Sequence, residues 1–423
     1  ADKAEDIAAP CVLIPPGTKR AAVEDLAVSA AVSTNRQRGA KTGDFARAAV
    51  LADEPALAEA LRERLDEPLA IAYVLPGLPP GGSGGSHSIA QEASALSAIG
   101  ARSRIVIEER FAARAREVYP EAASSFAAYG SPAELEAALD GFDVVVATEA
   151  PSARLVAERL RGRPDVLGAY YVQDYEPLFS PAGGPAADAA LLSYRQAEAL
   201  LLFAKTHWVA NAVGAAHGLP VAKVRPSLDR ATFHATGRAG RSGPARVVAM
   251  VRPRTPRRRA AETLIALRDL KTALGDDVEC LGFGCGEADL AGLPSAPEVQ
   301  QLGLLSRAAV AELLRSCDLF LDLSSYQAFG RTGLEAMACG AVPLLPRRGG
   351  VVEYATDDHD ALLVDTEDGA AVLASATALL GDRERLERLR AAGIETASSF
   401  SAIGAAVSQY ACFAANHPRA GRR

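Results

Sequence analysis

Long apolar runs are missing from this sequence of 423 residues. No stretch approaches the roughly 20 apolar residues that cross a bilayer, and residues 1–9 mix acids with alanine, unlike a signal peptide. We therefore expect no transmembrane segment and a cytoplasmic location. A peripheral contact with the inner face of a membrane stays open as an alternative.

An excess of positive charge is missing as well. The chain has 45 Lys and Arg against 52 Asp and Glu, a net charge of −7. Proteins that bind nucleic acids collect positive charge to displace the counterions of the phosphate backbone, so we expect no nucleic-acid partner. A small anionic ligand needs only a local basic pocket. The sequence gives no indication of an oligomeric state.

Paired cysteines are absent too. The six cysteines are scattered and have neither the spacing of a zinc site nor that of a disulfide framework. No Asp-x-Asp follows an apolar run in residues 69–238, and the acids at 357–360 fall in a polar turn. We therefore predict buried, reduced thiols and no metal site.

What the sequence contains is an alternation of short apolar runs with helix-length segments, which is typical of parallel α/β sheets. It begins after an alanine-rich and charged extension with a helical pattern at 43–65. The first series predicts strands at 69–75, 103–108, 143–147, 168–172 and 206–210, and helices at 87–100, 132–139 and 187–202. After a polar stretch at 236–244, the second predicts strands at 246–251, 278–283, 318–323, 341–345 and 361–364, and helices at 260–274, 306–316 and 332–339.

Ligands of open parallel sheets bind beyond the carboxyl ends of the strands, so we expect functional residues directly after these runs. The run at 318–323 leads into Tyr-Gln-Ala-Phe-Gly-Arg-Thr-Gly-Leu-Glu-Ala-Met-Ala-Cys-Gly at 326–340. Gly330 and Gly333 open a helix whose free N–H groups and positive dipole end attract a phosphate. One turn in, the Glu335 carboxylate can accept hydrogen bonds from ribose hydroxyls.

This segment, 326–340, resembles the signature of glycosyltransferase family 4, in which an acidic residue, Phe-Gly and a second acid eight positions on precede Ala-Met-Ala-x-Gly. The second acid is Glu335, but Gln327 stands in place of the first. In the family the first acid lies beside the transferred sugar and the second holds the ribose. The resemblance implies these donor-binding residues: Phe329, Gly330, Arg331, Thr332, Gly333 and Glu335.

Two more segments of the second series resemble the family. Arg252 and Arg257 follow the run at 246–251 with the five-residue spacing of the basic residues that bind the donor diphosphate. Arg-Arg-Gly-Gly-Val-Val-Glu at 347–353 resembles a Gly-Gly turn that lines the donor pocket and ends on Glu353, with an ordinary turn as the alternative.

The first series carries the matching glycine-rich loop, Gly-Gly-Ser-Gly-Gly-Ser at 81–86, which approaches the donor phosphate in the family. Gly84 and Gly85 are the implied contacts, and a plain flexible turn is the alternative. His87 beside them is either a helix-start residue or a group of the site.

A narrower resemblance is to bacterial rhamnosyltransferases that use dTDP-L-rhamnose in surface-glycan assembly. It is carried by Arg-Pro-Arg-Thr-Pro-Arg at 252–257 and by Tyr-Tyr-Val-Gln-Asp-Tyr-Glu-Pro-Leu-Phe at 170–179. Gln173 in the second segment stands where many family members have a His beside the donor sugar. The implied sugar and acceptor side is His87, Gln173 and Asp174.

The resemblances imply a GT-B fold, an α/β architecture of two Rossmann-like domains facing across a cleft. The implied domains are an N-terminal extension (1–68), an acceptor domain (69–238), a donor domain (239–395) and a C-terminal helix that crosses back (396–423). The implied reaction is a retaining, metal-independent transfer of a sugar, L-rhamnose or another deoxyhexose, from dTDP to a glycan or lipid-linked acceptor, with no further cofactor. The implied catalytic residues are Arg252, Arg257, Gln327, Glu335 and Asp174.

Two other functions remain as alternatives. A non-catalytic nucleotide-sugar-binding protein is suggested by Gln327, because an amide cannot stabilise positive charge as a carboxylate does. An NAD-dependent oxidoreductase is suggested by Gly-Phe-Gly-Cys-Gly at 282–286, although the third glycine of that fingerprint and its ribose-binding acid are missing.

Overall fold

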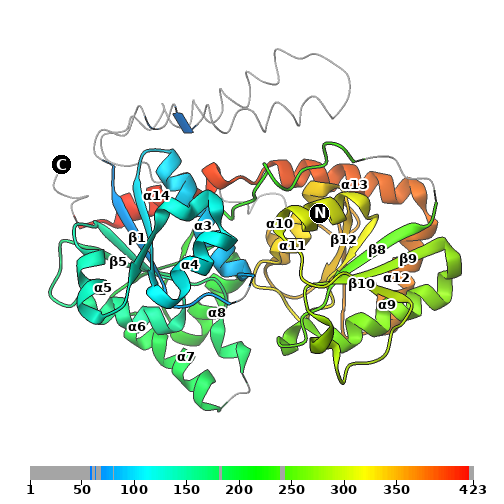
Figure 1. The fold of residues 1–423 in the computed structure, drawn as a ribbon, viewed down its shortest axis with the longest axis horizontal. Coiled ribbons are helices and arrows are strands. Elements are labelled where there is room, and N and C mark those ends of the chain that lie inside the picture. The colour runs from blue at the N-terminus through cyan, green and yellow to red at the C-terminus, as the bar shows by residue number, and fades with distance from the viewer. Residues whose placement is uncertain are drawn as a thin grey trace. The chain divides into compact units, whose positions relative to one another are not determined.

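The computed structural model describes residues 58–59, 62, 68–79, 81–180, 183–238 and 243–418. Most of the helical pattern expected at 43–65 therefore lies outside the described residues. The chain divides into two compact units, each built around its own parallel sheet (Figure 1). The first unit takes the described residues up to Ser227 and those from Ala402 onward, and the second spans Leu228–Ser401.

The sheet of the first unit has seven parallel strands in the order β3-β2-β1-β4-β5-β6-β7. The strands are β1 (Ala70–Leu75), β2 (Arg102–Glu108), β3 (Phe126–Tyr129), β4 (Val144–Ala147), β5 (Leu167–Tyr171), β6 (Leu201–Ala204) and β7 (Ala222–Lys223). Tyr73 of β1 lies opposite Ile105 of β2 and Val146 of β4, and all three side chains are fully buried. Burial on both faces explains the continuous apolar runs.

Seven helices cover this sheet in the part of the chain that the structure describes. They are α3 (Gly84–Ala98), α4 (Glu109–Val118), α5 (Pro132–Leu139), α6 (Ala150–Arg159), α7 (Pro185–Gln196), α8 (His207–His217) and α14 (Ala402–Asn416). Although α14 follows the whole second unit in sequence, it packs on α3 in the first (Figure 1, red). The Phe413 ring of α14 meets Phe203 edge-on, with centroids 5.2 Å apart.

One strand prediction for the first unit is wrong, and two predicted helices have other bounds. A strand is predicted at 206–210, but Thr206 caps α8 and its hydroxyl oxygen accepts from the Val209 N–H at 3.2 Å. The strand is β6, which takes the end of the helix predicted at 187–202, because apolar periodicity alone does not divide a short buried strand from a helix. The helix predicted from His87 begins at Gly84, because Ser83 and Ser86 form a capping box.

The second unit has a six-stranded parallel sheet in the order β10-β9-β8-β11-β12-β13. The strands are β8 (Ala245–Met250), β9 (Val278–Phe283), β10 (Val299–Gln301), β11 (Leu319–Leu321), β12 (Val342–Pro346) and β13 (Leu362–Val364). The helices of its described residues are α9 (Ala260–Leu274), α10 (Arg307–Ser316), α11 (Arg331–Cys339), α12 (Gly369–Gly381) and α13 (Arg383–Ser398). Every strand and helix predicted for this unit is confirmed. β10, α12 and α13 were not predicted.

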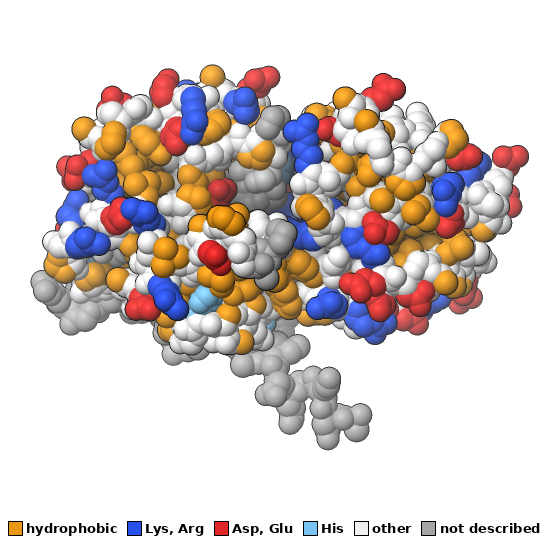
Figure 2. Space-filling model, turned by 90° about the horizontal axis from the view of Figure 1, so that it is seen from below, with side chains coloured by type: hydrophobic (Ala, Val, Ile, Leu, Met, Phe, Trp, Pro, Cys, Tyr) orange, Lys and Arg blue, Asp and Glu red, His pale blue; other side chains and the backbone are white. Residues whose placement is uncertain are grey.

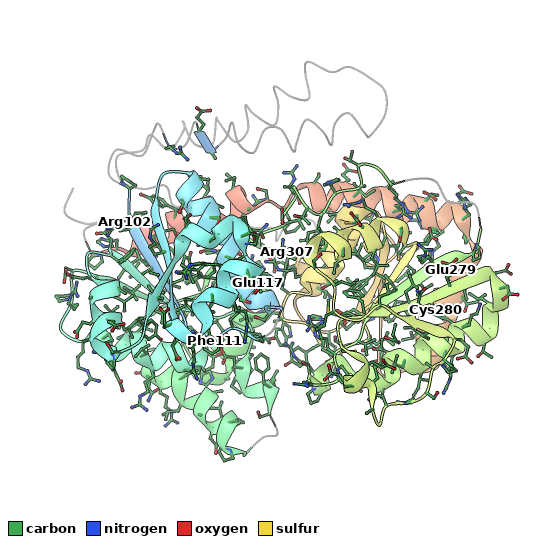
Figure 3. The ribbon with its side chains drawn as sticks, viewed as in Figure 1. Arg102, Phe111, Glu117, Glu279, Cys280 and Arg307 are labelled. Atoms are coloured by element: carbon green, nitrogen blue, oxygen red, sulfur yellow. The ribbon has the colours of Figure 1, made fainter. Side chains whose placement is uncertain are left out.

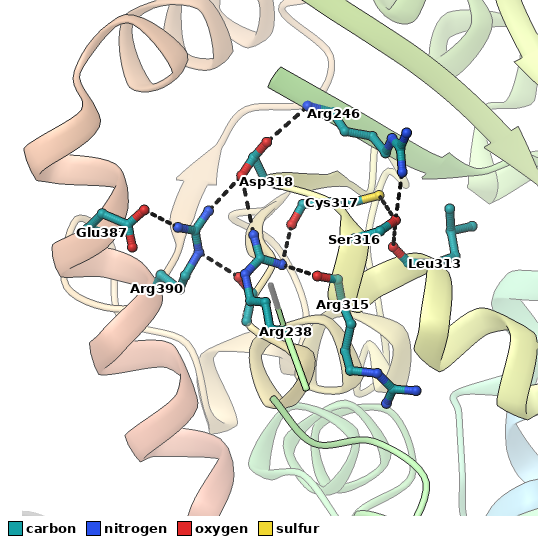
Figure 4. Close-up of polar contacts among 10 residues, drawn as sticks. Arg238, Arg246, Leu313, Arg315, Ser316, Cys317, Asp318, Glu387 and Arg390 are labelled. Carbon is teal, nitrogen blue, oxygen red and sulfur yellow. Dashed lines mark hydrogen bonds and ion pairs between the residues drawn. The ribbon is translucent and has the colours of Figure 1, made fainter. Parts of the chain in front are cut away.

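An ion network closes the amino-terminal end of β11 (Figure 4). The Asp318 carboxylate pairs with Arg238 at 3.2 Å and with Arg390 of α13 at 2.8 Å, and it accepts from the Arg246 N–H at 3.0 Å. Three segments far apart in sequence are joined there. Because ligands bind at the opposite, carboxyl end of parallel strands, this network is structural.

Successive side chains of β9 point to opposite faces of the sheet, so a charged residue and a buried thiol stand next to each other in sequence. Glu279 forms an ion pair with Arg246 at 2.7 Å, whereas its neighbour Cys280 is only 3% exposed (Figure 3). The five described cysteines are free thiols, and all but the half-buried Cys412 are buried, as predicted. On the face drawn in Figure 2, acidic and basic side chains are interspersed.

Candidate functional site

Two loops meet at the carboxyl end of the second sheet. The strand order reverses between β8 and β11, and open α/β sheets bind ligands at such switch points. The loop after β8 carries the predicted Arg252 and Arg257, and the loop after β11 carries the start of the signature segment. The Ser325 N–H donates to the Arg257 carbonyl oxygen at 2.9 Å, and the Arg257 guanidinium lies 5.1 Å from the centre of the Tyr326 ring. The structure thus brings the two predicted groups together.

The signature helix α11 begins at Arg331, after Gly330 with a left-handed φ of 79°. The Gly330 carbonyl oxygen accepts from the Gly333 N–H at 3.0 Å and from the Tyr354 hydroxyl at 2.7 Å. A Cβ at Gly333 would lie 2.5 Å from that hydroxyl, so packing explains this glycine. The phosphate contacts at this helix start stay predictions.

Glu335, the predicted ribose contact, is 6% exposed, and Arg331 lies 4.0 Å from its carboxylate. Burial raises the pKa of this carboxyl from 4.5 to about 7, and the charges of Arg331 and Arg307 offset only part of the effect. Arg307, on α10 (Figure 3), is itself held by Asp229 at 2.5 Å. Hydrogen bonds from a ligand diol would favour the charged form of Glu335.

Gln327 is 2% exposed, and its amide is bound by residues that the sequence pattern did not single out. Its Nε2 donates to Oδ2 of Asp322 at 2.5 Å and to Oγ of Ser324 at 3.1 Å. Asp322 falls inside the strand predicted at 318–323, but β11 ends one residue before it, so it lies at the carboxyl end of that strand. An acid at the end of an apolar run is the signal that could have found it.

Arg252 is a half-buried cation without an acidic partner in the described part of the chain. Its Nε donates to the sulfur of Met250 at 3.4 Å, which is a weak acceptor, and burial lowers the pKa of its guanidinium. Arg254, two residues on, is exposed and pairs with Asp289 at 2.8 Å. Because a buried unpaired charge is costly, Arg252 is the arginine of this loop that an anionic ligand would stabilise.

Two other predicted donor contacts differ in exposure. Phe329 is 4% exposed, so its side chain belongs to the core. Glu353 is half-buried and ends a short turn, η6 (Gly350–Glu353), after β12. The first N–H of η6 donates to the Gln327 carbonyl oxygen at 2.6 Å. The predicted Gly-Gly turn is thus joined to the signature segment.

In the first unit the strand order reverses between β1 and β4, and the predicted glycines lie after β1. Gly84 and Gly85 form the first turn of α3 instead of a free loop. A Cβ at Gly85 would come within 2.9 Å of Nε2 of Gln173, which follows β5. Gln173 also donates to the Thr148 carbonyl oxygen at 3.4 Å, while its Oε1 has no hydrogen-bond partner in the described residues. His87 is half-buried.

The two acids after β5 have different surroundings. Asp174 is 9% exposed, and its Oδ1 accepts from the Tyr175 N–H at 2.9 Å. Glu176, which the sequence pattern did not single out, accepts the Ala150 N–H with both carboxylate oxygens, at 2.9 and 3.1 Å. Burial raises the pKa of Glu176 to about 7. Glu176 therefore holds the start of α6, and Asp174 stays the predicted acceptor residue.

The glycine run of the oxidoreductase alternative does not lead into an α-helix. β9 is followed by a single 3₁₀ turn, η5 (Glu287–Leu290), whereas the dinucleotide fingerprint needs a helix start for the pyrophosphate. A Cβ at Gly282 would lie 2.5 Å from the Gln301 side chain, so packing explains that glycine. The described residues contain no group of three His, Cys, Asp or Glu placed to hold a metal ion.

Where the structure is described, every helix is too short or too polar to reach across a bilayer.

Residues 240–396 match the family model described as Glycosyl transferases group 1. The O-antigen biosynthesis protein RfbC of Myxococcus xanthus is 33% identical over 228 residues, which are 54% of this chain and 17% of RfbC. The uncharacterized glycosyltransferase YqgM of Bacillus subtilis strain 168 is 31% identical over 114 residues, 26% of this chain and 31% of YqgM. The matched segments span less than a third of either curated relative.

The fold is similar to that of solved structures. Anabaena Alr3699/HepE in complex with UDP-glucose has a TM-score of 0.66 at 16% identity, covering 81% of this chain and 98% of that one. At this identity the likeness shows the fold alone, and it confirms the predicted α/β fold of GT-B type with two Rossmann-like domains. Residues 240–396 are accordingly similar to the glycosyltransferase group 1 family, within a chain of GT-B fold.

Proposed function

We propose that the chain is a glycosyltransferase that moves a sugar from a nucleoside diphosphate to a hydroxyl group of a glycan or lipid-linked acceptor. The observation that carries this proposal is the half-buried Arg252, which has no acidic partner in the described chain and lies at the switch point between β8 and β11. A diphosphate supplies the missing counter-charge, and each charge-assisted hydrogen bond contributes roughly 1.5 to 3 kcal/mol. Arg257 and the helix start at Arg331, Thr332 and Gly333 are the further proposed phosphate contacts.

The proposed transfer is retaining and metal-independent. The bond from the sugar C1 to the diphosphate oxygen breaks, a bond from C1 to the acceptor oxygen forms on the same face, and the acceptor proton passes to the leaving phosphate. The positive charge of Arg252 and Arg257 and the dipole of α11 stabilise the departing diphosphate. Glu335 holds the ribose and Gln327 faces the transferred sugar.

The first unit supplies the acceptor and sugar side of the proposal. Gln173 and Asp174 follow β5, at the carboxyl edge where ligands of parallel sheets bind. His87 follows β1 at the switch point of the same sheet, beside Gly84 and Gly85, which are proposed contacts of the donor phosphate.

The donor is proposed to be dTDP-L-rhamnose or another dTDP-deoxyhexose. The segments 252–257 and 170–179 support it through their resemblance to rhamnosyltransferases, and RfbC supports a role in surface-glycan assembly. The proposed location is the cytoplasm, with a peripheral contact at the inner face of the membrane as the alternative. The UDP-glucose bound to Alr3699/HepE makes a UDP-sugar the competing donor.

A panel of nucleotides tests the proposal. The unfolding temperature of the full chain is measured with dTDP, UDP, GDP, ADP and NAD, because a ligand that binds the native state raises it by mass action. We expect dTDP to stabilise most, and stabilisation by NAD alone would support the oxidoreductase. If no nucleoside diphosphate stabilises the chain, the proposed function is wrong.

A second candidate is a non-catalytic nucleotide-sugar-binding protein, favoured by the amide at Gln327. Binding without turnover, over a range of glycan and lipid-linked acceptors, would support it. Release of free dTDP from the sugar nucleotide in the presence of an acceptor would support the enzyme.

A further inference from the structure

We propose that Asp322 is a positioning residue for the donor sugar and acts through Gln327. The inference rests on the proposed function, in which Gln327 faces the transferred sugar. Nε2 of Gln327 donates to Asp322 at 2.5 Å and to Ser324 at 3.1 Å, which uses both of its hydrogens. The polar atom that Gln327 has left for a sugar is its carbonyl oxygen, Oε1.

The direction of each hydrogen bond in this cluster is determined by its chemistry. An ionised carboxylate only accepts, so the Ser324 hydroxyl donates to Oδ1 of Asp322, at 2.5 Å, and the hydroxyl lone pairs accept from Gln327. The Ser324 N–H donates to the same Oδ1 at 3.1 Å. A flipped amide would turn its oxygen toward the carboxylate, lose the hydrogen bond to Asp322, and compete with Asp322 for the single hydrogen of the Ser324 hydroxyl. The cluster therefore specifies Gln327 as a hydrogen-bond acceptor.

Burial and backbone contacts hold this arrangement in place. Asp322, Ser324 and Gln327 are 7%, 0% and 2% exposed, so water hardly competes for their polar atoms. The main-chain carbonyl oxygen of Gln327, distinct from Oε1, is also close to Gly349, where a Cβ would come within 2.2 Å of it. Arg258 lies 3.5 Å from Oδ2 of Asp322 and supplies the counter-charge that a buried carboxylate requires.

In this cluster the negative charge lies on Asp322, one hydrogen bond away from position 327. The family 4 signature has an acid at position 327, where this chain has an amide with the Asp322 carboxylate behind it. Hydrogen-bonded chains polarise one another in a low dielectric, so Asp322 strengthens Oε1 of Gln327 as an acceptor. Such a site selects a donor sugar that offers a hydroxyl hydrogen at this point, because a sugar without it would leave Oε1 unpaired.

The test exchanges the acid and the amide. The variants are Asp322→Asn, Gln327→Glu and the double variant, with the exposed acid in Asp276→Asn as a control on the same unit. Gln327→Glu sets two carboxylates at hydrogen-bond distance, where both cannot be ionised. We expect its unfolding temperature to fall more at pH 8 than at pH 5. In the double variant the new amide can donate to the new carboxylate, so the unfolding temperature should recover at both pH values.

Kinetics with the sugar nucleotide separate positioning from folding. Asp322→Asn should keep the affinity for free dTDP or UDP within about twofold, because the cluster does not include the proposed phosphate or ribose contacts. It should lower kcat for sugar transfer by about tenfold or more, the loss expected for a hydrogen bond to a charged group. The double variant should recover most of kcat, and Asp276→Asn should match the wild type.

Each other outcome overturns the inference. Additive effects of the two single substitutions on unfolding would show that Asp322 and Gln327 are not coupled. Coupled unfolding with an unchanged kcat in Asp322→Asn would make the contact structural only. Failure of the proposed function can be told apart from failure of this inference. The wild type would then bind no nucleoside diphosphate, while the effects of the Asp322 and Gln327 substitutions on unfolding stay coupled. In that case the sugar-positioning role falls with it.

Discussion

The Tyr354 hydroxyl donates to the Gly330 carbonyl oxygen at 2.7 Å and occupies the space that a side chain at Gly333 would need. The start of α11 is therefore shaped from within the second unit, by a tyrosine 24 residues downstream of Gly330. The glycines of the signature segment are thus required for packing whether or not a phosphate binds. The support for a phosphate site comes instead from Arg252.

Substitution of Gly333 tests this packing account. Gly333→Ala should destabilise the chain by about 1 to 3 kcal/mol, because its Cβ would lie 2.5 Å from the Tyr354 hydroxyl and 2.8 Å from Leu345. Tyr354→Phe alone should cost about 0.5 to 1.5 kcal/mol through the lost hydrogen bond. In the double variant the cost of Gly333→Ala should shrink, as measured by urea unfolding, since the hydroxyl is gone. Strictly additive costs would show that Tyr354 does not restrict position 333.

Two neighbouring arginines give a matched test of the anion site. Arg252→Ala should weaken dTDP or UDP binding at least about tenfold, because it removes a half-buried charge that can bond a phosphate. Arg254→Ala should change the affinity by less than about twofold, because its guanidinium is exposed and bound to Asp289. Titration calorimetry at two salt concentrations checks both. Equal losses of affinity in the two variants would show that the nucleotide is attracted by a general basic surface and not by a specific contact with Arg252.

Glu335 should make stability depend on pH. Its folded pKa, about 7, lies above the ordinary value of 4.5, so the charged form is disfavoured in the folded state. The stability that the folded state keeps while Glu335 is neutral is fully present below pH 4.5. It is lost as pH rises to 7 and above, because the buried carboxyl must then ionise. Glu335→Gln does not titrate, so relative to the wild type it should gain on the order of 2 to 3 kcal/mol between pH 4 and pH 8.

Urea unfolding of both proteins at the two pH values measures this gain. Parallel pH profiles would show that Glu335 titrates normally. The same variant should bind nucleoside diphosphates more weakly, because an amide is a poorer acceptor for the ribose hydroxyls than a carboxylate. A gain in stability with a loss in binding is the pattern expected of a functional residue.

The elements that the sequence predicts well have local signals. α5 begins and ends at the predicted residues because Ser131 caps it and Pro132 stands at its first position. β3 (Phe126–Tyr129) escapes prediction because it is a short edge strand that is mostly half-buried, so it has no long apolar run. Near Thr206 the difficulty is the opposite one. The buried strand β6 and the capped helix α8 follow each other within one apolar stretch, so the pattern does not show where one ends and the other begins.

Some features of the candidate site are also visible in the sequence, and others arise only from the fold. The signature segment is visible in sequence because Gly330, Glu335 and their neighbours have fixed spacing. The bond between Asp322 and Gln327 is not, because it depends on how the chain turns after β11 and leaves no periodic trace. The pairing of Gly85 with Gln173 joins residues after β1 and β5, which only the strand order brings together. The raised pKa of Glu335 comes from burial, which one sequence does not reveal.

The adjacent glycines at the start of α3 test the role of Gln173. A Cβ at Gly84 meets nothing within 4 Å, so Gly84→Ala should leave Gln173 in place and add about 0.5 to 1 kcal/mol of stability through helix propensity. A Cβ at Gly85 would lie 2.9 Å from the Gln173 amide, which can move because it is the end of a flexible side chain. Gly85→Ala should therefore fold normally and displace Gln173.

If Gln173 lines the sugar side, this displacement should lower kcat/KM for transfer by about tenfold, while the affinity for free dTDP stays within about twofold, because a misplaced contact near the reacting sugar affects the transition state most. Gln173→Ala should then have a similar effect, and Gly85→Ala should add little to it, since both act on one side chain. Full transfer activity in Gly85→Ala, with the unfolding temperature unchanged, would remove Gln173 from the sugar side and leave Asp174 as the residue to test after β5.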